Sequence, residues 1–174
     1  MFDEDESKGL LRRSLLWRRG CDTPSLTRIN FPDGHATVPS WSWMAYTGGI
    51  NYLDLDFGGL DWEDLQSHWS RTEDREGNNA LTAKAREYDR NAANEFESSL
   101  IFDAGEGLEP DKGMCVVLGA QKGWMPPEDK RHYLLLIVPT TKSDRNGSRV
   151  FERIGVGYLP GKCIASETSV VSIH

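Results

Sequence analysis

The sequence predicts an all-β fold: an antiparallel β-barrel or sandwich of seven to nine strands, with one or two short helices in a central insertion. Short apolar and β-branched runs recur in both outer parts of the chain, separated by segments rich in Gly, Pro, Asp and Ser that supply turn geometry. Between them, residues 61–97 change to helical spacing. The 174 residues suffice for one hydrophobic core, so we expect a single domain over 1–174, with β blocks at 8–60 and 98–174.

The first block contains the most distinctive pattern of the chain. Trp41 and Trp43 lie two residues apart, and the turn residues Thr47-Gly48-Gly49 follow. Residues two apart on a strand share a face, so the pattern predicts an aromatic hairpin with both Trp side chains on one side. The strands expected in this block are 12–18, 25–30, 40–46 and 49–56.

The central block, residues 61–97, predicts two short helices in an acidic insertion. Asp61 is placed to cap a helix on which Trp62, Leu65 and Trp69 share a face. Residues 61–110 hold 13 acidic and 5 basic residues, so most of the net charge of −7 belongs to this part of the chain. The second helix is predicted from a narrow apolar stripe formed by Leu81, Ala85, Tyr88, Ala92 and Phe96.

The third block returns to strand patterns. Residues 133–138 are the longest apolar run, which indicates a buried strand. The expected strands are 114–118, 132–138, 150–159 and 169–173, and 97–102 can add another.

Composition and charge exclude several classes of function. The net charge of −7 disfavours nucleic-acid binding, and no apolar run approaches the roughly 18 residues of a membrane helix. Cys21, Cys115 and Cys163 share no C-x-x-C spacing, and no two histidines stand at ligand spacing, so we expect neither a disulfide framework nor a metal or cofactor. The acidic N-terminus lacks signal-peptide character, which favours a cytoplasmic protein.

One candidate pocket follows from the aromatic hairpin. Asp54 and Asp56 lie two apart on the predicted next strand, as a carboxylate pair able to act in general acid–base catalysis, and His68 can reach the same neighbourhood. A carboxylate beside an aromatic wall has a raised pKa, as proton transfer requires. The alternative is that both aspartates form the solvated face of an amphipathic strand. The residues expected to line the pocket are Trp41, Trp43, Tyr46 and Tyr52.

Several short motifs together carry a family resemblance. Leu15-Leu16-Trp17, the run from Val38 to Trp43 and Gly48-Gly49-Ile50 occur in this order. They are similar to the region that follows the HET domain in fungal heterokaryon-incompatibility proteins, where a Pro-Ser-Trp-Ser-Trp element is common. The resemblance continues in Cys115–Gly119, Tyr133–Leu136 and Phe151–Gly157, and covers about residues 8–60 and 113–160.

The motifs typical of the HET domain itself do not occur in this chain. The resemblance therefore implies either a fragment of a HET-type protein or a stand-alone β-rich domain without the HET domain. On this reading the chain is a fungal regulatory or interaction module that binds a protein partner. The alternative is a cofactor-independent cyclase or isomerase of fungal secondary metabolism, which binds a hydrophobic small molecule in the aromatic pocket. Exposed sheet edges leave a homodimer open in either case.

Overall fold

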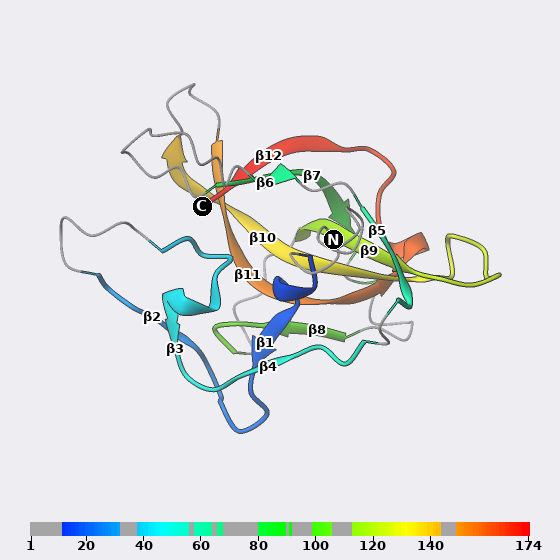
Figure 1. The fold of residues 1–174 in the computed structure, drawn as a ribbon. Coiled ribbons are helices and arrows are strands. Elements are labelled where there is room, and N and C mark those ends of the chain that lie inside the picture. The colour runs from blue at the N-terminus through cyan, green and yellow to red at the C-terminus, as the bar shows by residue number, and fades with distance from the viewer. Residues whose placement is uncertain are drawn as a thin grey trace, which may run out of the picture.

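The predicted all-β fold is confirmed in the computed structural model of the chain, and of the two expected architectures it is the barrel. The structure describes residues 12–31, 38–55, 58–63, 66–67, 80–89, 91, 99–105, 113–143 and 149–174. Five strands close into a barrel in the order β7-β9-β10-β11-β12, and β12 pairs with β7 to complete the ring (Figure 1). The barrel strands are β7 (Leu81–Tyr88), β9 (Gly113–Gln121), β10 (Arg131–Ser143), β11 (Arg149–Pro160) and β12 (Ser169–Ile173).

The barrel is antiparallel except at one seam. Successive strands from β7 to β11 pair antiparallel, whereas β11 and β12 pair in parallel through Val150–Ser172 and Phe151–Ile173. A short 3-10 helix, η2 (Gly161–Cys163), follows β11 at the start of the connection between these two strands. Closure removes free edges from the barrel strands along their paired stretches.

Three shorter strands extend the sheet beyond the barrel. The strand β5 (Leu60–Trp62) pairs with β9, β6 (Gln66–Ser67) pairs with β7, and β8 (Ser99–Phe102) pairs with β11. Gly155 and Gly157 of β11 allow β8 to approach closely, because a Cβ atom at Gly157 would lie 2.0 Å from the carbonyl oxygen of Ser99. The close packing of β8 on β11 therefore depends on glycine at these positions.

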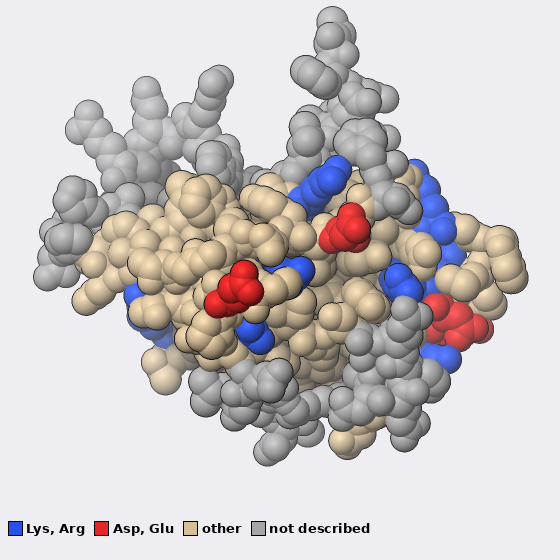
Figure 2. Space-filling model, turned by 90° about the horizontal axis from the view of Figure 1, so that it is seen from below, with Lys and Arg blue, Asp and Glu red and all other residues tan. Residues whose placement is uncertain are grey.

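The N-terminal part of the chain forms two small sheets beside the barrel. The strand β1 (Trp17–Arg19) pairs with β4 (Ile50–Tyr52), and β2 (Thr27–Arg28) pairs with β3 (Tyr46–Thr47). A second 3-10 helix, η1 (Trp43–Ala45), precedes β3. Figure 2 views the molecule from the side of β1 and β4, where isolated acidic and basic residues stand in a largely uncharged surface.

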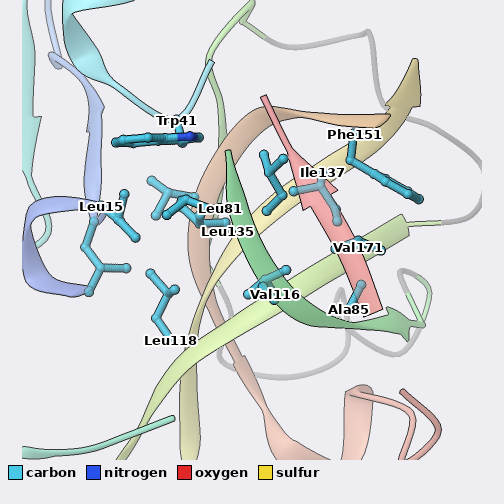
Figure 3. Close-up of a cluster of buried hydrophobic side chains, with 14 of the residues drawn as sticks. Leu15, Trp41, Leu81, Ala85, Val116, Leu118, Leu135, Ile137, Phe151 and Val171 are labelled. Atoms are coloured by element: carbon cyan, nitrogen blue, oxygen red, sulfur yellow. The ribbon is translucent and has the colours of Figure 1, made fainter. Parts of the chain in front are cut away.

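Close-packed apolar side chains occupy the barrel interior (Figure 3). In β10, Leu135 and Ile137 face this core, whereas Leu134 and Leu136 face a second cluster on the outside of the sheet. The strand predicted to be buried is therefore covered on both faces. Burial of this kind is the main favourable term in folding. The labelled members of the inner core are Leu15, Trp41, Leu81, Ala85, Val116, Leu118, Leu135, Ile137, Phe151 and Val171.

In the central block, the prediction of helix at Asp61–Trp62 and over residues 81–88 is wrong, whereas the described Asn91 is helical. Residues 60–62, which include the expected N-cap Asp61, are strand β5, and residues 81–88 are strand β7. The spacing of Leu81 and Ala85 suits a helix face, but both also fit the alternation with Ala83 that buries one face of a strand. Pairing with β12 and β9 on its two sides makes β7 a wall of the barrel rather than part of an insertion.

The predicted aromatic hairpin is also wrong. The strand expected over 40–46 is instead a turn followed by η1, because the Ser42 side chain accepts a hydrogen bond from the Met44 amide (3.4 Å) and the Ser42 amide donates to Pro39. The strands β3 and β4 flank the Gly48-Gly49 turn but pair with β2 and β1, not with each other. The strand expected over 12–18 begins as a helical turn at 12–14 and is extended only from Trp17.

No helix among the described residues has the length and apolar character needed to cross a membrane.

Replacing Gly157 with Ala tests the close approach of β8. The new Cβ would meet backbone rather than a movable side chain, so we expect Gly157→Ala to lower the free energy of unfolding by about 1–3 kcal/mol. Gly49→Ala is the matched control: its nearest neighbour is the Thr23 hydroxyl at 3.0 Å, and it should cost less than about 1 kcal/mol. Urea denaturation measures both, and equal costs would contradict the assignment.

Candidate functional site

The aromatic residues expected to line one pocket lie in different environments. Trp41 is 6% exposed and packs in the barrel core, whereas Trp43 is 47% and Tyr52 is 48% exposed. Tyr46 is half-buried, and its ring lies 5.5 Å from that of Trp17, at an interplanar angle of 52°. These side chains do not form one continuous wall, because the strand that would have aligned the two Trp residues is a turn.

Of the predicted catalytic residues, only Asp54 lies in the described part of the chain. Asp54 is exposed and follows the end of β4. Asp56 and His68 lie outside the described residues. The proposed pairing of Asp54 and Asp56 as general acid and base therefore stays a prediction.

The structure instead reveals a buried polar centre between the N-terminal sheets and the barrel. The Arg153 side chain is fully buried, and its Nε donates to Oδ2 of Asp103 at 2.9 Å while Nη2 donates to Oδ1 at 3.1 Å. Nη1 donates to the carbonyl oxygen of Leu15 at 3.0 Å, and Nη2 also donates to that of Trp17. We call this group of Arg153, Asp103, Leu15 and Trp17 the guanidinium clasp.

An aromatic ring covers the guanidinium of the clasp. The Arg153 Cζ atom lies 3.2 Å from the centroid of the Trp17 ring, which is a cation–π contact in a desolvated setting. The indole of Trp17 is held in turn, because its Nε1 donates to the carbonyl oxygen of Trp41 at 2.9 Å. The clasp thus links β1 to the segment that precedes η1.

Local backbone features place the two charged partners. Arg153 lies at a β-bulge of β11, where the register with β10 shifts between Leu136 and Ile137. Asp103 follows the last residue of β8, and its amide donates to the carbonyl oxygen of Ile154, within the bulge, at 2.8 Å. The carbonyl of Asp103 accepts from the Leu26 amide at 2.7 Å, so both backbone groups of Asp103 are also satisfied.

Ser40 adds a second connection between the N-terminal segment and the barrel. Its buried hydroxyl accepts a hydrogen bond from the Arg153 amide at 3.0 Å and donates to the carbonyl oxygen of His174. The Pro-Ser-Trp-Ser-Trp element therefore uses its first serine and first tryptophan to dock on the barrel. Its second tryptophan, Trp43, is left facing solvent.

Burial shifts the pKa of two groups near these contacts. Burial, and then the charge of Asp103, raise the pKa of the Tyr46 phenol to about 12. Burial also lowers the pKa of the Arg153 guanidinium, although the Asp103 carboxylate and its hydrogen bonds favour the charged form. Both shifts arise from the packing of the N-terminal sheets against β11.

The guanidinium clasp is built to hold the chain together rather than to catalyse a reaction. Arg153 donates through four of its five N–H groups, and both Asp103 oxygens accept from it, so neither charged group is directed at a ligand. Burial raises the pKa of the Cys115 thiol to about 12, which makes it a poor nucleophile. Within the described ranges, no three His, Cys, Asp or Glu side chains are grouped as metal ligands would be.

Sequence reasoning missed the clasp, although a signal was present. The buried positions of β11 are apolar or glycine except for Arg153, which interrupts a run that is otherwise suited to a barrel wall. A charged residue at such a position requires a buried partner. The sequence did not identify Asp103 as that partner, because the two residues are separated by 50 positions.

Comparisons with known proteins give no relative: no family model, no curated protein and no solved structure matches this chain.

Removing the Arg153 side chain tests the clasp. Arg153→Met leaves Asp103 buried without its cation, so we expect the free energy of unfolding to fall by about 3–5 kcal/mol. Adding Asp103→Leu should recover part of this loss. Arg28→Met is the control, because Arg28 and Glu152 form a half-exposed pair at 3.9 Å, worth less than about 1 kcal/mol. Similar costs for Arg153→Met and Arg28→Met, measured by urea denaturation, would contradict the role of the clasp.

The Tyr46 phenol provides a test by titration. A folded-state pKa of about 12, above the usual 10, stabilises the fold below pH 10, and this contribution disappears as the pH rises towards 12. Ultraviolet difference spectroscopy should show one tyrosine that ionises near pH 12, absent in Tyr46→Phe. The loss of stability between pH 10 and 12 should be smaller in that variant. An unchanged titration curve in Tyr46→Phe would refute the assignment.

Proposed function

We propose that this chain is a non-catalytic interaction module, similar to the β-rich region of HET-type fungal proteins, that binds a protein partner through η1. The observation that carries the proposal is the exposure of two large apolar side chains on a short, firmly held helix. Trp43 is 47% and Met44 is 54% exposed, on consecutive residues. Trp is among the residues most enriched in the energetic centres of protein interfaces.

The elements around η1 hold this surface in place. Ala45 is fully buried, its amide donates to the Ser42 carbonyl at 3.0 Å, and its own carbonyl accepts from the Ile29 amide at 2.8 Å. On the other side of η1, the buried Trp41 and Ser40 are fixed to the barrel. A side chain on a fixed backbone loses less conformational freedom on binding, which favours affinity.

The packing of the barrel also supports a binding module over an enzyme. A cyclase or isomerase would need a cavity with carboxylates and aromatic side chains facing its substrate. In the described residues, apolar side chains pack together in the barrel interior, Trp41 is one of them, and Asp54 faces solvent. The resemblance in the Pro-Ser-Trp-Ser-Trp element favours the same conclusion.

Site-directed photocrosslinking from position 43 tests this proposal. A photoreactive phenylalanine analogue replaces Trp43 in the full chain, expressed in the cells from which the protein comes. We expect one discrete crosslinked protein, identified by mass spectrometry and lost in a Met44→Lys background. The same analogue at Thr141, an exposed residue of β10, is the control. Identical crosslinks from both positions, or none from position 43, would refute the proposal.

The purified partner then allows a quantitative test. Trp43→Ala should weaken binding at least tenfold, which corresponds to about 1.4 kcal/mol. Trp124→Ala is the matched control, because Trp124 is 93% exposed. It belongs to the segment between β9 and β10, which lies on the opposite side of the barrel from η1 in Figure 1. Equal effects of the two substitutions, measured by calorimetry, would contradict a site at η1.

A further inference from the structure

We propose that the chain forms a symmetric homodimer in which β4 of one copy pairs antiparallel with β4 of a second copy. The inference is independent of the proposed partner site at η1. The strand β4 belongs to a two-stranded sheet with β1. Within the part of the chain that the structure describes, β1 is the only strand paired with β4.

The hydrogen bonds around β4 show which of its backbone groups are free to pair. The Gly20 amide donates to the Gly49 carbonyl at 2.7 Å, and the Leu53 amide donates to the Leu16 carbonyl at 2.9 Å. In an antiparallel ladder the backbone N–H and C=O groups of every second residue face the same neighbouring strand, and those of the residues between them face the other side. Gly49, Asn51 and Leu53 therefore direct their backbone groups towards β1, and those of Ile50 and Tyr52 point away from it.

The opposite edge of the same sheet is already occupied. The carbonyl oxygen of Trp17 points away from β4 and accepts from Arg153 in the guanidinium clasp. Leu15 accepts from Arg153 in the same way. The barrel thus covers the β1 side of this sheet, and β4 is its outer edge, near the bottom of the view in Figure 1.

The β4 edge is short, but it lacks the charges and prolines by which many edge strands avoid pairing. Residues 48–53 contain no charged residue and no proline. By contrast, β5 carries the exposed Asp61, and the part of β10 beyond its pairing with β9 carries Pro139 and Lys142. Charges and proline on an edge oppose strand addition, and their absence favours it.

A second copy of β4 fits this edge with Asn51 opposite Asn51. With the two-fold axis at Asn51, Ile50 of each copy faces Tyr52 of the other, and these two pairs supply four main-chain hydrogen bonds. Each pair sets a β-branched side chain beside an aromatic ring, a favourable cross-strand combination. Tyr52, now 48% exposed, would lose much of its exposed surface. Asp54 would face Gly48 of the other copy, so no like charges meet.

Amide hydrogen exchange in the unmodified protein provides the main test. The edge is short, so we expect a dissociation constant in the micromolar range or weaker, with the dimer visible by sedimentation velocity at high concentration. The amides of Ile50 and Tyr52 should exchange slowly at high concentration and fast on dilution. The amide of Asn51, which faces β1, should be protected under both conditions.

Two substitutions check the same edge. Ile50→Pro removes an outward-facing N–H from each copy, and Tyr52→Lys adds a charge beside Ile50 of the other copy; each should weaken association at least tenfold. Met44→Lys, which disrupts the proposed partner site at η1, should leave the dimer unchanged. A strictly monomeric protein, or a dimer in which exchange at Ile50 and Tyr52 does not depend on concentration, would overturn the proposal.

Discussion

The position of the N-terminal sheets depends on one buried cation. Arg153 extends from a bulge in a barrel strand and binds, with a single planar group, a carboxylate from the turn after β8 and two carbonyl oxygens from residues around β1. A planar guanidinium fixes the direction of several acceptors at once, which an ammonium group cannot do. Three segments distant in sequence are therefore held in one arrangement.

The value of this contact lies in specificity more than in net stability. Burying two charges removes them from water, and their attraction often does no more than offset this cost. An apolar pair of similar volume could contribute as much free energy, but it would fix neither the direction of β1 nor the position of Asp103. For this chain we regard the clasp as the contact that fixes the N-terminal sheets in one orientation on the barrel. In that orientation the Trp17 ring packs against the Arg153 guanidinium and against the Tyr46 ring.

Sequence patterns predicted the fold class and the buried strands, but not the contacts between distant segments. The run Tyr133–Ile137 is apolar throughout and became a strand buried on both faces. The stripe containing Leu81 and Ala85 was misread as helical because these positions satisfy both periodicities, and only pairing with β9 and β12 selects the strand. The Pro-Ser-Trp-Ser-Trp element was predicted as a strand for another reason: its alternating pattern does not reveal that its serines bond to the backbone. The Ser42 hydroxyl accepts from the Met44 amide in a turn, and the Ser40 hydroxyl accepts from the Arg153 amide of the barrel.

The same constraint explains why the proposed binding surfaces lie where they do. Because Arg153 and Ser40 hold the inner side of the N-terminal sheets against the barrel, the opposite side of those sheets must face outward. That outer side contains η1 with its exposed Trp43 and Met44, and the edge of β4 that pairs with no other strand of the described residues. A chain whose buried polar groups fix one sheet on another gains outward surfaces of defined geometry, which the proposed binding of a partner and of a second copy requires.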